Sequence, residues 1–338
     1  MTAQAAASGE LPTPAQFGEI FSSIEKEIGK VVVGHEEALR QILVAFFGGG
    51  HVLIEGVPGI GKTLIVRSLG EALGLSFSRV QFTIDLMPAD VTGTRILEES
   101  EGGGRTMNFV KGPIFAHVML ADEINRATPK TQSALLEAMA ELQVTVAGTT
   151  HRLPSPFFVL ATLNPIEMEG TYPLPEAQLD RFLFKVPLAY PGVEQIREIV
   201  RETTGAEMGK IQPVFDHEPD TKVNQLRRLV REVIVAPEVE SYVAHLVRET
   251  IPELTETDRV KKYVDFGSSP RGAQSLVLGA KVRALLAGRV NVAFSDVESV
   301  APVALSHRMV LNFAAETEGV TPKSIIEHLL EVGKKWQR

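Results

Sequence analysis

An eight-residue segment rich in glycine has the pattern of a phosphate-binding loop. It reads Gly56-Val57-Pro58-Gly59-Ile60-Gly61-Lys62-Thr63 and matches G-x-x-x-x-G-K-[ST] at every fixed position. The glycines let the backbone curl so that successive N–H groups point at a polyphosphate. In this pattern Lys62 reaches the β and γ phosphates, and Thr63 offers its hydroxyl to Mg²⁺. The segment therefore predicts a nucleoside triphosphate, ATP in the simplest case, bound together with Mg²⁺.

Such a loop works between a strand and a helix, and the flanking sequence predicts both. Apolar residues 51–54 indicate a buried strand, and residues 64–73 have helical spacing. The helix adds its positive end to the phosphate site, and its first residue, Leu64, is expected among the nucleotide contacts. The alternative is a merely flexible glycine-rich turn, and the flanking strand and helix argue against it.

Two acidic residues, Asp122 and Glu123, directly follow the apolar residues 118–121. At the end of a strand beside the loop strand, their carboxylates would point at the γ phosphate. Asp122 would hold Mg²⁺ through water, and Glu123 would orient or deprotonate the attacking water. The alternative role for these acids is to cap the helix that follows.

Three further polar residues, Asn164, Arg181 and Arg271, lie at the ends of predicted strands or helices. Asn164 follows apolar residues 159–163 and could hydrogen-bond both the γ phosphate and the water, although Asn-Pro alone indicates only a turn. Arg181 ends a short helical segment, where an ordinary helix-end cation is the alternative. Arg271 opens a later helix, from which it could swing onto the phosphates.

Strand-like and helical segments alternate up to about residue 190. Short apolar runs predict strands at residues 51–54, 79–82, 117–121, 157–162 and 182–186. Helical patterns occur at residues 15–28, 36–47, 64–73 and 128–141. The alternation predicts an α/β fold, with a five-stranded, mostly parallel sheet covered by helices on both faces.

Two segments interrupt this alternation, residues 91–110 and 142–153, and both have the pattern of a β-hairpin. A solvated surface loop is the alternative for each.

From residue 191 onward the pattern is wholly helical, with candidate helices at residues 195–202, 222–233, 237–250, 271–286, 295–304 and 322–332. We therefore expect a flexible tail over 1–14, an α/β domain over 15–190 and a helical domain over 191–338.

Composition narrows the functional classes. The net charge of −8 gives no general attraction to nucleic acid or to anionic membranes. The absence of cysteine excludes disulfides, thiol catalysis and cysteine-ligated zinc, and agrees with a reducing compartment. No apolar run is long enough to span a bilayer, and the tail lacks the features of a signal peptide. We expect a cytoplasmic protein with no membrane insertion.

The motifs together resemble the MoxR family of AAA+ ATPases. The resemblance extends from about residue 17 to residue 330 and rests on the phosphate loop and residues 122–126, 162–165, 179–182 and 269–271. It implies an αβα ATPase core and a helical lid. The first hairpin would be the helix-2 insert and the second the pre-sensor-1 hairpin, which places the chain near magnesium chelatase motors.

The resemblance also implies roles for particular residues. Asn164 would be sensor 1, Arg181 the arginine finger given to the neighbouring subunit, and Arg271 sensor 2. The stretch Val32, Val33 and Gly34 is similar to the one that lines the adenine pocket in this superfamily. Arg126 either touches the adjoining subunit or is a surface residue at the start of a helix.

The implied activity is ATP hydrolysis by an oligomeric ring, expected to be a hexamer, that remodels or activates partner proteins by metal or cofactor insertion or complex maturation. The family implies a partner with a von Willebrand factor A domain, which binds through its own metal site and a carboxylate of the ring. The alternative is a nucleotide-controlled scaffold or switch with slow turnover. A nucleic-acid motor is disfavoured by the acidic stretch 98–101, and a small-molecule kinase by the lack of an acceptor motif.

Overall fold

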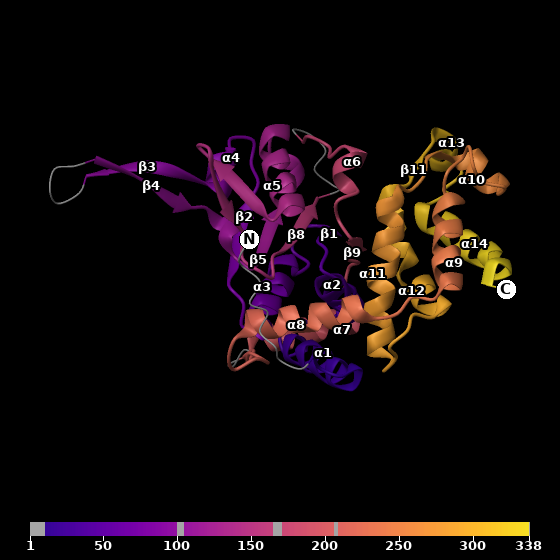
Figure 1. Cartoon of the computed structure of the whole chain (residues 1–338), viewed down its shortest axis with the longest axis horizontal. Coiled ribbons are helices and arrows are strands. Elements are labelled where there is room, and N and C mark those ends of the chain that lie inside the picture. Colours follow the sequence, from indigo (N-terminus) through magenta and orange to yellow (C-terminus); the bar gives the residue numbers. More distant parts are fainter. Residues whose placement is uncertain (1–10, 100–104, 165–170, 206–208, 338) are drawn as a thin grey trace, which may run out of the picture.

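A five-stranded parallel sheet carries the larger part of the chain (Figure 1). The computed structural model describes residues 11–99, 105–164, 171–205 and 209–337, so residues 1–10 of the expected tail and part of the acidic stretch 98–101 lie outside the description. The strands are β1 (Val52–Glu55), β2 (Phe77–Gln81), β5 (Val118–Asp122), β8 (Phe158–Leu163) and β9 (Phe184–Pro187). Their order is β2-β5-β8-β1-β9, with every neighbouring pair parallel, which confirms the predicted fold class.

Helices cover both faces of the sheet because successive strand residues point to opposite sides. The principal covering helices are α1 (Pro14–Gly29), α2 (Glu36–Gly48), α3 (Lys62–Leu73) and α5 (Pro129–Glu141). Val52 and Ile54 pack in one apolar cluster with α1, α2 and α3. Leu53, between them, packs on the other side with α5. The sheet is thus buried on both faces, as parallel sheets require.

Each of the two interrupting segments contains an antiparallel hairpin. After the short helix α4 (Pro88–Thr92), β3 (Gly93–Glu99) pairs with β4 (Arg105–Lys111) and extends away from the body (Figure 1). The second hairpin pairs β6 (Gln143–Val146) with β7 (Thr149–Arg152). The ring of Phe109 in the first hairpin stacks on the ring of His151 in the second, with centroids 3.9 Å apart. The two hairpins are therefore in direct contact.

The rest of the chain is helical apart from one short strand pair. After α6 (Glu176–Leu179), the helices are α7 (Val193–Thr204), α8 (Pro219–Glu232), α9 (Pro237–Arg248), α10 (Asp258–Tyr263), α11 (Pro270–Leu286), α12 (Phe294–Leu305), α13 (Phe313–Thr317) and α14 (Pro322–Gly333). Helices α10 and α13 were not expected, and neither was the pairing of β10 (Val264–Phe266) with β11 (Val310–Leu311) in a part of the chain predicted to be wholly helical. These strands are too short to leave a period-2 signal in the sequence. Among the described residues, no helix is long and apolar enough to cross a membrane.

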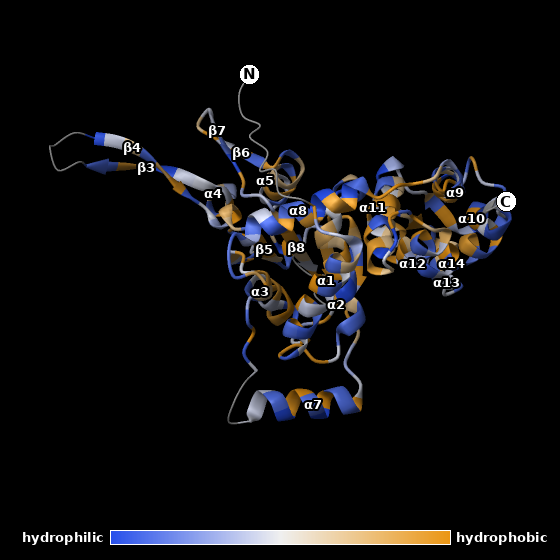
Figure 2. Cartoon of the chain, turned by 60° about the horizontal axis from the view of Figure 1, so that its bottom comes forward, coloured by the Kyte–Doolittle hydropathy of each residue, from blue (hydrophilic) through white to orange (hydrophobic). Residues whose placement is uncertain are grey.

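Two of these helices lie against the α/β part in different ways. In α8, Val223, Leu226 and Val230 are buried, and the helix packs on both α2 and α11. Helix α7 is separated from the other ribbons in Figure 2 and has no buried residue, but its side chains Ile196 and Ile199 line a cavity together with residues 58–61 of the α/β part. Helix α11 packs along α1 and α2, and this contact fixes the position of Arg271 near its first turn.

Candidate functional site

The phosphate loop has the backbone conformation that its glycines allow. It connects β1 to α3, and Gly59 and Gly61 have φ angles of +82° and +89°, in the left-handed region that favours glycine. The Nζ atom of Lys62 donates to the carbonyl oxygen of Gly56 at 2.6 Å. Burial lowers the pKa of Lys62, whereas the charges of Asp122 and Glu123 raise it. The loop thus places a buried cation at the N-terminus of a twelve-residue helix, an arrangement that fits a polyphosphate.

A cavity of about 360 Å³ adjoins the loop and has the size and apolar lining of a nucleobase site. Its lining comprises Val31, Val32, Val33, His35, Pro58, Gly59, Ile60, Gly61, Leu64, Tyr190, Pro191, Ile196, Ile199, Glu202 and Thr203. Two of the three expected adenine contacts, Val32 and Val33, therefore line it. The third, Gly34, has φ +83° and lies against Gln195 of α7.

His35 was not anticipated from the sequence. Its side chain is buried, and its Nε2 atom lies 2.9 Å from the carbonyl oxygen of Ile60. The contact joins the loop before α2 to the phosphate loop, so the base cavity and the phosphate site are held in register. A lone histidine before a helix gives no sequence signal for this role.

Asp122 and Glu123 lie at the carboxyl edge of the sheet with the phosphate loop. Parallel strands place their carboxyl ends at one edge, and β8 alone separates β5 from β1. Thr162 of β8 links the two acids: its Oγ1 donates to Asp122 Oδ1 at 2.6 Å and accepts from the Glu123 amide at 2.8 Å. Glu123 has φ +54°, a strained conformation of the kind found at functional sites.

Cations surround these two carboxylates. Arg79 Nη2 lies 2.7 Å from Asp122 Oδ2, and Arg126 Nη1 lies 3.0 Å from Glu123 Oε2. The charges of both acids also act on the pKa of Lys62, so three cations lie near the two carboxylates. Arg126 is exposed and lies two residues before Thr128, the N-cap of α5, which agrees with a surface position near the start of a helix; a contact with an adjoining subunit stays a prediction.

Asn164 lies at the same edge, directly after β8. Its side chain is buried, with 4% of the residue exposed. Because β8 lies between the strand that leads into the phosphate loop and the strand that ends in Asp122, Asn164 has the position expected of a residue that contacts the γ phosphate and its attacking water.

Arg181 and Arg271 lie together at the opposite edge of the sheet. Both line a cavity of about 290 Å³ with Gly50, His51 and Leu183, residues that precede the amino ends of β1 and β9. The four residues of β1 alone span roughly 13 Å, at about 3.3 Å each. Arg271 therefore does not face the phosphate loop of its own chain, and its placement does not support the expected swing onto those phosphates.

Asp180 joins this edge to the C-terminal helices. It accepts from Ser269 Oγ at 2.7 Å and from Arg308 Nε at 2.8 Å, and Arg271 Nη1 lies 3.7 Å away. Burial lowers the pKa of Arg308, and the neighbouring Asp180 raises it. Arg308 also donates to the carbonyl oxygens of residues 180, 182 and 183. No local motif marks Arg308 in the sequence, because its contacts with residues 180–183 reach across more than a hundred residues.

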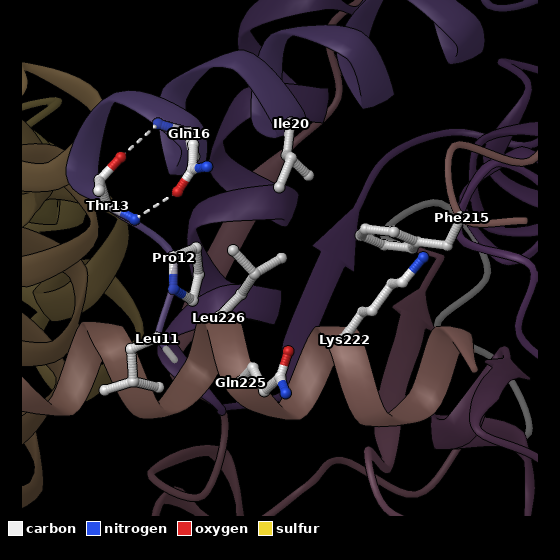
Figure 3. Close-up of a pocket in the computed structure, with 9 residues that line it drawn as sticks. All are labelled: Leu11, Pro12, Thr13, Gln16, Ile20, Phe215, Lys222, Gln225 and Leu226. Carbon is white, nitrogen blue, oxygen red and sulfur yellow. Dashed lines mark hydrogen bonds between the residues drawn. The ribbon is translucent and has the colours of Figure 1, made fainter. Parts of the chain in front are cut away.

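A separate cavity of about 520 Å³ lies between the start of α1 and α8 (Figure 3). Thr13 and Gln16, which exchange hydrogen bonds at the start of α1, lie on one side of it, and Leu226 lies among the residues of α8. The ammonium of Lys222 lies 5.8 Å from the centre of the Phe215 ring. The cavity shares no lining residue with the base cavity or with that of Arg181.

Comparison with known proteins agrees with this geometry. The family model "ATPase family associated with various cellular activities (AAA)" matches residues 51–184, and an AAA lid domain model matches residues 256–329. Chaperone MoxR1 of Mycobacterium tuberculosis is 42% identical over 307 residues, which cover 90% of this chain and 79% of the relative. The chain belongs to the MoxR family of AAA+ ATPases.

Two further matches agree with this assignment. Protein MoxR of Methylorubrum extorquens is 33% identical over 85% of this chain and 86% of its own. A crystal structure of a candidate ATPase from Cytophaga hutchinsonii has a TM-score of 0.85 and 39% identity, and the match covers 94% of this chain and 95% of that one. The chain is thus an ATPase with an AAA core and a helical AAA lid.

Proposed function

We propose that this ATPase works as an oligomeric ring, a hexamer by family resemblance, that uses ATP hydrolysis to remodel or activate partner proteins. The observation that carries the proposal is the division of the catalytic groups between two edges of the sheet. Lys62, Asp122 and Glu123 lie at the carboxyl edge, whereas Arg181 and Arg271 line a cavity at the amino edge. A complete site then needs the amino edge of a second copy.

The residues at the carboxyl edge have complementary roles in the proposal. Lys62 binds the phosphates, and Asn164 holds the attacking water against the γ phosphate. Glu123 accepts the proton of that water. Thr63 and Asp122 would hold Mg²⁺, which supplies positive charge that neutralises the phosphates, and the oxygen ligands they offer are those that this ion prefers.

Arg181 has a buried hydrogen-bond donor that an anion could satisfy. Its Nη1 donates to the carbonyl oxygen of Leu136 at 2.9 Å, but its buried Nε has no hydrogen-bond partner in the described part of the chain. An unsatisfied buried donor costs about 1–3 kcal/mol. A phosphate of a neighbouring subunit's nucleotide would supply the missing acceptor, and Arg271 in the same cavity would add a second cation.

The remodelling role is supported by the relative named a chaperone and by the protruding β3–β4 hairpin. This hairpin exposes apolar side chains, namely Ile96, Leu97, Met107 and Val110. Exposed apolar residues on a protruding element suit transient contacts with a protein client. We further propose, from family membership alone, a partner with a von Willebrand factor A domain and insertion of a metal or cofactor into the client. A cytoplasmic location stays a prediction.

Dilution tests the divided site. The ATPase rate per subunit should fall as the protein is diluted and should follow the fraction assembled, measured by sedimentation velocity in the same buffer. Nucleotide binding should persist in the dilute protein, because each chain carries its own phosphate loop and base cavity. A rate per subunit that stays constant through complete dissociation would contradict the proposal.

A further inference from the structure

Arg79 is a residue that the ATPase mechanism above does not use. It lies on β2, the edge strand of the sheet, two residues before Gln81. Its partner strand ends in Asp122, which is paired in register with Gln81. Because side chains two residues apart point to the same face, Arg79, Gln81 and Asp122 share one face of the sheet. The geometry therefore brings a cation to the acid proposed to hold Mg²⁺.

The contacts of Arg79 are specific. Its Nη2 atom donates to Asp122 Oδ2 at 2.7 Å and to Gln81 Oε1 at 3.1 Å. The side chain of Asp122 is 12% exposed and that of Arg79 is 46% exposed. The amide nitrogen of Gln81 in turn donates to Glu123 Oε2 at 2.8 Å. One arginine is thus connected to both carboxylates of the acidic pair.

Both carboxylate oxygens of Asp122 are engaged in this arrangement, Oδ1 by Thr162 and Oδ2 by Arg79. A divalent cation held by Asp122 would stand close to the guanidinium, and two like charges at such a distance repel. Mg²⁺ and Arg79 are therefore alternative counterions of one carboxylate. Since Arg79 is nearly half exposed, its side chain can turn into solvent at little cost.

We propose that Arg79 is a positioning residue that holds Asp122 in competition with Mg²⁺, so that binding of the Mg²⁺–nucleotide complex releases Arg79 and, through Gln81, loosens the hold on Glu123. The inference rests on the proposed role of Asp122. Removal of Arg79 should therefore strengthen metal binding, whereas removal of Lys62 should weaken nucleotide binding. Linkage makes the effect reciprocal: the metal weakens the Arg79–Asp122 pair by the same factor.

The test uses Mn²⁺ as the probe, with the full-length protein saturated with a non-hydrolysable ATP analogue. Electron paramagnetic resonance measures the free Mn²⁺, and hence its dissociation constant from the complex. Arg79→Gln should bind Mn²⁺ roughly two- to fivefold more tightly than the wild type, in keeping with a partly exposed ion pair. Asp122→Asn should bind it more weakly.

Arg40→Gln is the matched control. Arg40 is also 46% exposed and pairs with a mostly buried carboxylate, Glu25, at 2.8 Å, but this pair lies between α1 and α2. Its loss removes the same charge from the chain and should leave Mn²⁺ affinity within about twofold of the wild type. If Arg79→Gln fails to fold, Arg79→Met, which keeps an unbranched stem, gives the same comparison.

Each result decides the inference. Unchanged or weaker Mn²⁺ binding in the Arg79 variants would overturn it, and so would an equal gain in Arg40→Gln, which would reflect net charge alone. Failure of the proposed nucleotide site has a different signature, since the wild-type protein would then not bind the ATP analogue, and Asp122→Asn would leave Mn²⁺ binding unchanged.

Discussion

Mixing two inactive variants tests whether the site is divided between subunits. Arg181→Ala removes the donated cation and leaves the phosphate loop, Asp122 and Glu123 of the same chain intact. Glu123→Gln removes the general base and leaves the amino-edge cavity intact. If Arg181 acts on a neighbouring subunit, each variant supplies what the other lacks, and a mixed ring regains activity.

The structure allows the size of each effect to be estimated. A donated arginine accelerates phosphoryl transfer by about 10³–10⁵-fold in enzymes that use one, so Arg181→Ala alone should lose roughly a thousandfold or more. The variant should still fold, because its main loss is one hydrogen bond to the carbonyl oxygen of Leu136, worth about 1 kcal/mol. In an equal random mixture of the two variants, about a quarter of the interfaces combine an intact Glu123 with an intact Arg181.

A second mixture provides the control. Wild-type subunits mixed equally with the Arg181→Ala/Glu123→Gln double variant also give active interfaces in about a quarter of cases if Arg181 acts on the neighbour. If Arg181 acts within its own chain, the first mixture stays inactive and the second retains about half of the wild-type rate. The assay is steady-state phosphate release after subunit exchange has been confirmed by fluorescence transfer between labelled subunits.

Either of two results would contradict a catalytic role of Arg181 in a neighbouring subunit. Recovery of no activity in the first mixture together with half in the second would place Arg181 in its own site. A single Arg181→Ala variant that retains wild-type turnover would remove the arginine from catalysis altogether. Recovery well below a quarter in both mixtures would retain the divided site but would show that the interfaces do not act independently.

Two further predictions follow from buried groups. Lys62→Ala should abolish binding of a fluorescent ATP analogue at equilibrium, because it removes the cation buried within the loop, whereas Glu123→Gln should keep binding and lose turnover; normal affinity in Lys62→Ala would contradict the assignment. Burial lowers the pKa of His51 from 6.5 to about 4, so between these values the unfolded chain binds a proton that the folded chain does not, and stability falls as the pH is lowered. From pH 7 to pH 5 the free energy of unfolding should drop by about 2 kcal/mol more in the wild type than in His51→Gln, measured by denaturant titration; equal drops would show that His51 is not the group responsible.

Much of the fold could be predicted from the sequence because its signals are local. The strands β1 and β5 are almost continuous apolar runs, and Gly49, with φ +79°, ends α2 where the glycine run predicts. The missed elements are short: β10 and β11 have three and two residues, so neither can show a periodicity. Their existence depends on the packing of helices far apart in the chain.

The residues of the candidate site also fall into two groups, those within local motifs and those placed by contacts with distant segments. Lys62, Asp122 and Glu123 lie in local motifs on strands whose carboxyl ends must meet, so the sequence predicts their proximity. Arg79 and His35 carry no motif, since the contacts to Asp122 and Ile60 that tie them to the site reach distant segments.

Arg271 shows why a motif alone can mislead about direction. Its place at the start of a helix predicts a cation directed at a phosphate, but it does not say whether the nucleotide belongs to the same chain or to a neighbouring subunit. That choice is made by α11, which packs along α1 and α2 and so carries Arg271 to the amino edge, beside Arg181. The contact of Arg308 with Asp180 at 2.8 Å fixes this placement through residues that no local pattern marks. If the site is divided between subunits, as proposed, the docking of the lid decides on which subunit Arg271 would act, and a conservative change at Arg308 should disturb Arg181 and Arg271 before it disturbs the nucleotide pocket.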